Sequence, residues 1–309
     1  MAARTPGAPG TYPDGSAPPA DRPRWFPPPT GRETGLVVRV VVVAVAVVVL
    51  LLALVWLAQR KLIYLPATGP VAPAHTVIPG AEDVELRTGD GLVLGAWHVP
   101  AEEPRRDIAV LVANGNAGDR SVRAPLARAL AARGMSVLLF DYRGYGGNPG
   151  DPTEVGLARD VRAAYRFLAE ERGVALDRML FYGESLGAAV VVELATEHQP
   201  GGIVLRSPFV DLASVGQIHY PFLPVRTLLK DRFLLSARLA EVKAPVTVVY
   251  GSRDSIVPPT QSQAVAESAP ELHRVVEVPG AHHNSPALLN GATLVDAVVD
   301  MADRIDRGS

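Results

Sequence analysis

A serine flanked by glycines is the strongest chemical signal in the sequence. The segment Gly-Glu-Ser-Leu-Gly occupies residues 183–187, directly after the apolar run 178–182 and directly before the helical stretch 188–198. This order predicts a strand, a sharp turn and a helix, with Ser185 at the apex of the turn. The two glycines let strand and helix approach closely around a strained residue. We therefore expect Ser185 to stand exposed as a nucleophile.

Two later segments supply an acid and a base. Asp254 follows the apolar run 246–250, and the pair His282 and His283 follows the run 275–278. An aspartate can accept a hydrogen bond from imidazole Nδ1–H, and an imidazole can take the serine proton and return it to a leaving group. Adjacent histidines also occur in metal sites, but no carboxylate lies at helical spacing from this pair and no third ligand is evident. The chain order serine, aspartate, histidine favours acyl transfer through Ser185.

A glycine-bearing turn is the candidate for stabilising the oxyanion. Residues 114–119 read Asn-Gly-Asn-Ala-Gly-Asp and follow the apolar run 108–113. Such a turn can direct backbone N–H groups toward a developing negative charge. The expected donors are the N–H of Asn116 and the N–H of Leu186, the residue after the nucleophile. The alternative reading of this segment is an ordinary connection between a strand and a helix.

These segments depend on a sheet to bring them together. The expected strands are residues 92–99, 108–113, 135–140, 179–182, 203–206, 246–250 and 275–278, and further expected helices are 121–133, 154–172, 261–268 and 292–304. Short buried strands alternating with helices predict an α/β fold with a mainly parallel sheet of about eight strands, covered by helices on both faces. Function in such a sheet is expected at the carboxyl ends of the strands.

The N-terminal part of the chain has a different character. Residues 1–35 form a tail rich in proline and glycine, which we expect to be disordered. Residues 40–58 contain no charged side chain and would span about 28 Å as a helix, close to the hydrocarbon thickness of a bilayer. We expect a transmembrane helix over residues 36–59, with a cleaved signal peptide and a buried core helix as the alternatives. A slight excess of arginine before the helix predicts a cytoplasmic N-terminus and an extracytoplasmic C-terminal domain.

The overall composition argues against several other classes of protein. A formal net charge of -2 gives no general attraction to nucleic acid. The absence of cysteine excludes disulfides, thiolate metal sites and a cysteine nucleophile. We therefore expect no nucleic-acid partner, no metal and no organic cofactor.

The remaining boundaries follow from these assignments. Residues 60–80 are the expected linker, and residues 81–309 are the expected catalytic domain. Within that domain, residues 208–243 are rich in apolar side chains and lie between two expected strands. This segment is placed to form a short cap over Ser185, where it could meet an acyl chain or the bilayer surface. The alternative is that its side chains pack a helix onto the sheet.

From about residue 81 to residue 304 the chain resembles the α/β-hydrolase superfamily, and within it the single-pass, membrane-anchored hydrolases. The resemblance rests on residues 114–118, on Asp-Tyr-Arg-Gly-Tyr-Gly at 141–146, on the Ser185 turn, on Ser-Pro-Phe at 207–209, and on the turns at Asp254 and His283. It implies an α/β-hydrolase fold with Ser185 as nucleophile, Asp254 as acid and His283 as base, because that family usually reads Gly-His-Asn at the histidine turn. The family most often has histidine where Asn114 stands, and frequently has aspartate where Ser285 stands.

Two further segments have a place in the resemblance. Residues 141–146 are expected to brace a loop rather than to take part in the chemistry. Asp211 is a rival for the triad acid in some hydrolases of this fold.

The expected function is that of a membrane-anchored serine hydrolase. It would cleave an ester or thioester of a lipid-like acyl substrate through an acyl-enzyme on Ser185. The alternatives are a serine peptidase of the same fold and a non-catalytic, membrane-tethered binding module.

Overall fold

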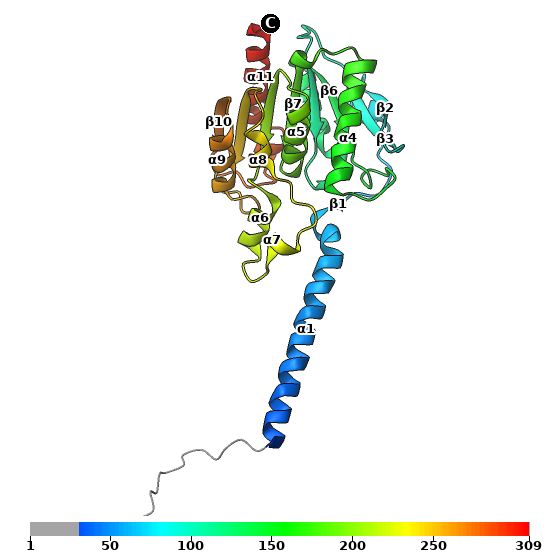
Figure 1. Ribbon diagram of the computed structural model, residues 1–309. Helices are drawn as coiled ribbons and strands as arrows, with labels where there is room; N and C mark the ends of the chain where they lie inside the picture. The colour runs from blue at the N-terminus through cyan, green and yellow to red at the C-terminus, as the bar shows by residue number, and fades with distance from the viewer. Residues whose placement is uncertain (1–30, 309) are drawn as a thin grey trace, which may run out of the picture. The chain divides into compact units, whose positions relative to one another are not determined.

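The computed structural model describes residues 31–308, so nearly all of the tail expected over residues 1–35 lies outside the described part (Figure 1). The chain divides into two compact units, Met1–Ala53 and Leu54–Ser309. The helix α1 (Gly31–Ile63) runs from the first unit into the second. Within its segment Thr34–Ile63, an 18-residue window has a mean hydropathy of 3.4, and none of that window is buried by other parts of the protein. This helix is long and apolar enough to span a membrane, a property that a signal sequence would share.

An eight-stranded sheet forms the centre of the second unit. Its strands lie in the order β10-β9-β8-β7-β4-β6-β3-β2. Their bounds are β2 (Glu82–Arg87), β3 (Val93–Val99), β4 (Ala109–Ala113), β6 (Ser136–Phe140), β7 (Met179–Glu184), β8 (Gly202–Arg206), β9 (Val246–Gly251) and β10 (Leu272–Val278). The β2–β3 and β3–β6 pairs are antiparallel and all other pairs are parallel. The predicted fold class, a mainly parallel sheet of about eight strands, is confirmed.

Helices cover both faces of this sheet (Figure 1). One face carries α4 (Glu154–Arg166), α5 (Leu186–Glu197), α8 (Leu235–Leu239) and α9 (Pro259–Ser268), and the other carries α3 (Ala124–Ala131) and α11 (Ala292–Arg307). The shorter helices are α2 (Ala74–Val77), α6 (Leu212–His219), α7 (Val225–Leu228) and α10 (Pro286–Leu289), with 3-10 turns η1 (Arg120–Arg123) and η3 (Leu176–Arg178) and a π-helical turn η2 (Phe167–Glu171).

The side chains of the central strand β4 are buried on both faces of the sheet. Ala109, Leu111 and Ala113 belong to the hydrophobic core under one layer of helices, whereas Val110 and Val112 belong to the core under the other. Successive side chains of a strand point to opposite faces, so a strand covered on both sides is apolar throughout.

Two features of the sheet were not expected from the sequence. The first is the edge strand β2, whose charged side chains alternate with Val84 and Leu86, the two residues that pack toward the core. The second is a separate two-stranded sheet in which β1 (Leu65–Pro66) pairs in parallel with β5 (Ala117–Gly118). This small sheet joins the chain just after α1 to the glycine-bearing turn after β4.

The segment between β8 and β9 has both an inward and an outward part. Leu235 and Leu239 of α8 are fully buried against the sheet helices. Tyr220 and Phe222, between α6 and α7, are exposed instead. Residues 208–243 were expected either to cap Ser185 or to pack a helix onto the sheet. Helix α8 packs onto the sheet, whereas the segment of α6 and α7 leaves apolar side chains exposed.

Candidate catalytic site

Ser185 occupies a strained turn between β7 and α5. Its φ of 51° and ψ of -110° lie where residues other than glycine are rarely found. A Cβ on Gly183 would lie 2.5 Å from Ala188 Cα, and a Cβ on Gly187 would lie 2.1 Å from Ala113 O, so both glycines are required by close approach. Ser185 is 7% exposed, and is thus buried rather than exposed as the sequence predicted.

Asp254 and His283 come together from the ends of β9 and β10. His283 Nδ1 and Asp254 Oδ2 are 2.7 Å apart, and both side chains are buried. Asp254 Oδ1 accepts hydrogen bonds from the N–H groups of Ile256, at 3.0 Å, and Val257, at 2.8 Å. Burial alone would raise the pKa of Asp254, but the bonds from His283 and these two N–H groups outweigh burial and leave the pKa below its usual value. Asp254 is therefore held as a carboxylate beside the imidazole.

The two adjacent histidines have different surroundings. His283 is buried against Asp254, whereas His282 is exposed. Ser285 Oγ accepts a hydrogen bond from the N–H of His282 at 2.8 Å, and the N–H of Ser285 donates to the carbonyl of His282 at 3.0 Å. The serine that stands in place of the family's frequent aspartate thus closes the histidine turn.

A buried ionic cluster that was not predicted from the sequence lies beside these residues. Arg123 donates from Nη2 to Glu184 Oε1 at 2.5 Å and from Nε to Oε2 at 3.1 Å, and Arg206 Nη1 lies 3.6 Å from Glu184 Oε1. Burial would raise the pKa of Glu184, but the two guanidinium groups lower it below its ordinary value. A charged residue at the end of β8, as in Ile-Val-Leu-Arg, was the signal that could have found this cluster.

Arg206 connects the serine turn to the histidine turn. Its carbonyl accepts a hydrogen bond from the N–H of Ser185 at 2.8 Å. Its guanidinium donates to the carbonyl of His283 and, at 3.1 Å, to the carbonyl of Leu288. The fully buried Arg206 therefore links the two turns. Within residues 31–308, no hydrogen bond joins Ser185 directly to His283.

The turn expected to form the oxyanion hole is held in place by hydrogen bonds at Asn114. Asn114 Nδ2 donates to the carbonyl of Phe140 at 2.9 Å, and the hydroxyl of Tyr142 donates to the carbonyl of Asn114 at 2.9 Å. Asn114 thus ties the turn to the end of β6. The departure from histidine at this position leaves the turn anchored.

Asn116 is held by the segment that follows α1. Its Nδ2 donates to the carbonyl of Ile63 at 2.7 Å. Its carbonyl accepts from the N–H of Leu65 at 2.8 Å and from the hydroxyl of Tyr145 at 2.9 Å. The N–H of Asn116 donates to no other group among residues 31–308, and the N–H of Leu186 is in the first turn of α5, where helical N–H groups have no partner within the helix.

The segment 141–146 acts as a brace, as expected. Asp141 accepts hydrogen bonds from the backbone N–H of Arg120 at 2.7 Å and from its guanidinium. Burial raises the pKa of Asp141 to about 6, with Arg120 acting in the opposite direction. Arg143 is bound by Asp160 and Asp90. These contacts hold the loop that carries Tyr142 and Tyr145.

Asp211, the rival acid, has a different role in the fold. Its carboxylate accepts a hydrogen bond from the N–H of Ser214 at 2.6 Å and caps the N-terminus of α6. Of the two aspartates, Asp254 is the one bonded to His283.

Comparison with known proteins agrees with this architecture. A family model described as serine aminopeptidase, S33, matches residues 104–232. The uncharacterised protein Rv2307c of Mycobacterium tuberculosis is 51% identical over 259 residues, which cover 84% of this chain and 92% of that protein. The alpha/beta hydrolase domain-containing protein 17C of Xenopus tropicalis is 30% identical over 208 residues, covering 67% of this chain and 66% of its own length.

Among solved structures, the esterase Pf2001 of Pyrococcus furiosus matches with a TM-score of 0.65 and 19% identity, over 78% of this chain and 97% of that one. At this identity the likeness concerns the fold. The matched family model is one of hydrolases, which supports hydrolytic activity. Taken with the strand order and the relatives, these matches show that the chain belongs to the α/β-hydrolase superfamily.

Proposed function

We propose that this protein is a membrane-anchored serine hydrolase that cleaves an ester or thioester bond of a lipid-like acyl substrate. The observation that carries the proposal is the 2.7 Å contact between His283 Nδ1 and Asp254 Oδ2, at the same end of the sheet as the strained turn of Ser185. Such a pair has the arrangement required of a general base and the residue that orients it.

The chemistry follows from this assignment. Ser185 Oγ attacks the carbonyl carbon while His283 Nε2 takes the hydroxyl proton. The N–H groups of Asn116 and Leu186 donate to the oxyanion that forms. Collapse of the tetrahedral intermediate breaks the bond to the leaving alcohol or thiol, which receives the proton from His283. Water then attacks the acyl-enzyme with His283 again as base, which releases the acid and restores Ser185.

Asp254 has a supporting role in each step. Its carboxylate accepts from Nδ1–H, so that Nε2 is the nitrogen left free to take a proton, and it stabilises the imidazolium. The lowered pKa of Asp254 supports this role, because the carboxylate stays ionised wherever His283 can act as a base.

The membrane placement is part of the same proposal. Residues 36–59 form the transmembrane segment, residues 60–80 the linker and residues 81–309 the catalytic domain, with 208–243 as a cap. The N-terminus is cytoplasmic and the catalytic domain extracytoplasmic. A reporter fused after Ser309 that is active only in the cytoplasm should be silent, and an active one would reverse the orientation.

The test of the activity uses the full chain in detergent. Wild type should be labelled by a fluorophosphonate, and Ser185→Ala should not. Turnover of p-nitrophenyl esters of increasing chain length should then reach an optimum at a long acyl chain. Ser207→Ala is a matched control, because Ser207 is also a buried serine and directly follows a neighbouring strand, β8. Absence of labelling in folded wild type would contradict the proposal.

A second candidate is an aminopeptidase, favoured by the description of the family model that matches residues 104–232. The same site would then cut an amide, with His283 giving its proton to the leaving amine. Aminoacyl p-nitroanilides measure this directly. Hydrolysis of these amides by wild type, together with no turnover of any acyl ester, would favour the peptidase.

A further inference from the structure

An exposed apolar turn begins at the end of α6 and ends before α7. Phe222 is 78% exposed, and Tyr220 and Ile218 beside it are about half exposed. The turn is ordered, because the N–H of Leu223 donates to the carbonyl of Tyr220 at 3.0 Å and the two aromatic rings meet edge to face, with centroids 6.4 Å apart. We call residues 218–222 the apolar turn. Adjacent large apolar side chains on an ordered surface indicate a binding surface.

The segment after this turn is fastened to the last turns of α1, within the second compact unit. Gln59 is buried, with Nε2 donating to the carbonyl of Leu228 at 3.0 Å and Oε1 accepting from the N–H of Lys230 at 2.8 Å. Arg60 Nε donates to Asp231 Oδ2 at 2.9 Å, and Nη2 donates to Oδ1 at 3.2 Å. These bonds fix the height of residues 228–231 relative to the end of α1.

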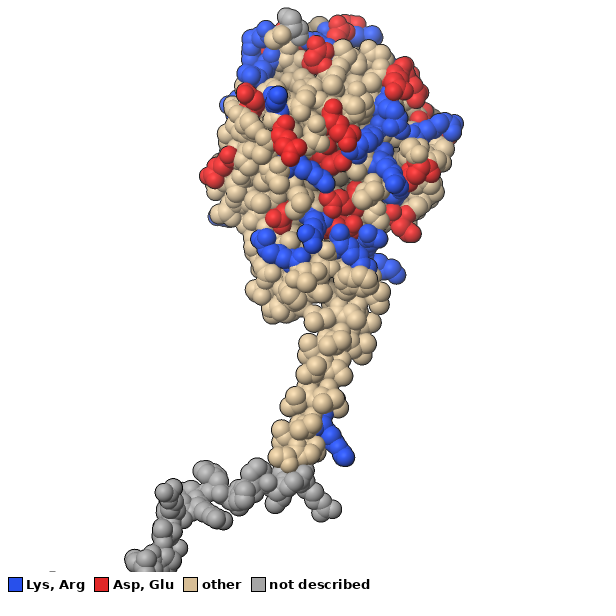
Figure 2. All heavy atoms as spheres, in the orientation of Figure 1, with Lys and Arg blue, Asp and Glu red and all other residues tan. Residues whose placement is uncertain are grey.

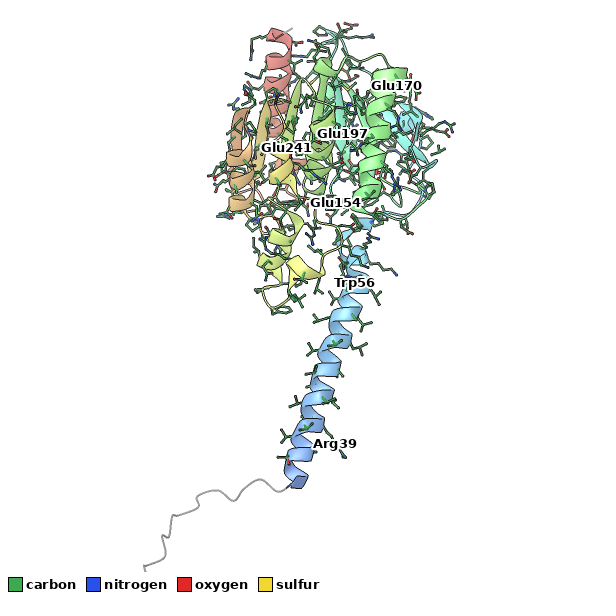
Figure 3. All side chains as sticks on the ribbon, viewed as in Figure 1. Arg39, Trp56, Glu154, Glu170, Glu197 and Glu241 are labelled. Atoms are coloured by element: carbon green, nitrogen blue, oxygen red, sulfur yellow. The ribbon has the colours of Figure 1, made fainter. Side chains whose placement is uncertain are left out.

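The end of α1 has the residues of a membrane–water interface. Trp56 projects from its last turns (Figure 3), and Lys230 Nζ lies 3.7 Å from the centroid of its ring. Lys61, which follows Trp56 in the chain, and Arg226, which precedes Lys230, are both exposed. Figure 2 shows Lys and Arg gathered beside the end of α1, with a surface free of charged residues next to them. Tryptophan and basic side chains are typical where a spanning helix leaves the bilayer.

We propose that the apolar turn and the basic residues Lys61, Arg226 and Lys230 dock on the anionic headgroup layer of the bilayer that α1 enters. The proposal rests on the proposed function in one respect, namely that α1 spans a membrane. Phe222 and Tyr220 insert among the acyl chains near the headgroups, and the three cations meet lipid phosphates and carboxylates. Asp231, the residue after Lys230, is already bound by Arg60.

Docking also places the candidate site beside lipid. His219, at the end of α6, is bonded through Nε2 to the carbonyl of Ile256 at 2.8 Å. The N–H of Ile256 in turn donates to Asp254 Oδ1. The helix that leads into the apolar turn is thus bonded directly to the loop of Asp254.

The absence of cysteine from the sequence makes a clean labelling experiment possible. The full chain is reconstituted in lipid nanodiscs as Phe222→Cys and, separately, as Leu272→Cys, each labelled with an environment-sensitive fluorophore. Leu272 is the matched control, because it is an exposed apolar residue at the first position of β10, at the opposite end of the sheet. A third variant, Val47→Cys, reports whether α1 itself lies in lipid. Nitroxide-bearing lipids are the quencher, in discs with and without anionic lipid.

We expect a blue-shifted emission and quenching at position 222 several times that at position 272. Replacing Lys61, Arg226 and Lys230 together by alanine, or removing the anionic lipid, should reduce quenching at 222. Equal quenching at 222 and 272, with strong quenching at 47, would overturn the docking while leaving the anchor intact. No quenching at 47 would mean that the anchor of the proposed function has failed. A blue shift at 222 that depends on the number of chains per disc, without lipid quenching, would mean that a second copy covers the turn and would also overturn the proposal.

Discussion

The contact between Asn116 and the chain after α1 makes a quantitative prediction. Asn116→Ala removes the 2.7 Å bond from Nδ2 to the carbonyl of Ile63 but leaves the backbone N–H that is proposed to face the oxyanion. Tyr145→Phe removes the 2.9 Å bond to the carbonyl of Asn116, which still accepts from the N–H of Leu65. Both changes loosen the same residue without deleting the donor, so both should lower kcat.

The size of the loss follows from these bonds. A neutral hydrogen bond contributes about 0.5–1.5 kcal/mol net. If that amount is lost from the transition state, kcat falls roughly 2- to 13-fold for Asn116→Ala. Tyr145→Phe should lie at the low end of this range, because a second donor remains. Complete loss of an oxyanion donor costs about 100- to 1,000-fold, which sets the upper limit. The double variant should deviate from the product of the two single effects, because the bonds meet at one residue.

The assay is steady-state turnover of a p-nitrophenyl ester by the full chain, with active sites counted by fluorophosphonate labelling. We expect the effect in kcat rather than in KM, because the N–H groups bind the oxyanion more strongly than the substrate carbonyl. Asn290→Ala is the control, an exposed asparagine at the end of α10 that should leave kcat unchanged. A lower melting temperature with an unchanged kcat in Asn116→Ala would refute the reasoning, since it would make the contact purely structural.

Three further predictions concern the proposed triad and the cluster beside it. Asp254→Asn should reduce turnover by about four orders of magnitude, as for other triads, whereas Asp211→Asn should leave turnover unchanged and cost little stability, because asparagine and aspartate cap helices about equally well; comparable kinetic losses in both would contradict the assignment. His283→Ala should abolish fluorophosphonate labelling and His282→Ala should retain it, and the reverse pattern would exchange the two roles. The pKa of Glu184 is lower in the folded protein than in the unfolded chain, so the unfolded chain binds a proton at a higher pH than the folded protein does. The stability that Glu184 contributes is therefore lost as the pH falls below its ordinary pKa of about 4.3. Urea unfolding should therefore show a shallower loss of stability between about pH 5 and pH 3 for Glu184→Gln than for wild type, and an equal slope would count against the ionic cluster.

Much of the fold could be predicted because its signals are local. The strands of the parallel sheet are short apolar runs, and the glycines around Ser185 mark a turn that tolerates no Cβ on either side. Because parallel strands end at the same edge of a sheet, the segments of Ser185, Asp254 and His283, which follow β7, β9 and β10, could be expected to meet there. Of the eight strands of the main sheet, the edge strand β2 was not predicted, because an exposed edge is charged and its two inward residues give too short an apolar pattern.

The contacts that could not be predicted join residues far apart in the chain. The Arg123–Glu184–Arg206 cluster unites η1, β7 and β8, and no single segment shows that these charges would be buried together. The same holds for β1 and β5, which pair over only two residues each. A strand this short has no periodicity, so its existence depends on the tertiary contact alone.

The chain just after α1 has a structural role in the candidate site as well as a connecting one. Ile63 and Leu65 bind Asn116, and the N–H of Ala67 donates to the carbonyl of Gly118 at 3.0 Å, so the glycine-bearing turn is one half of a sheet whose other half is this segment. A few residues earlier, Gln59 and Arg60 bind the segment after α7. Because both sets of bonds come from one short stretch, a shift of the end of α1 would reach the glycine-bearing turn and the segment after α7 together. The proposed membrane anchor and the proposed catalytic geometry are therefore connected by covalent chain and hydrogen bonds over fewer than ten residues, from residue 59 to residue 67.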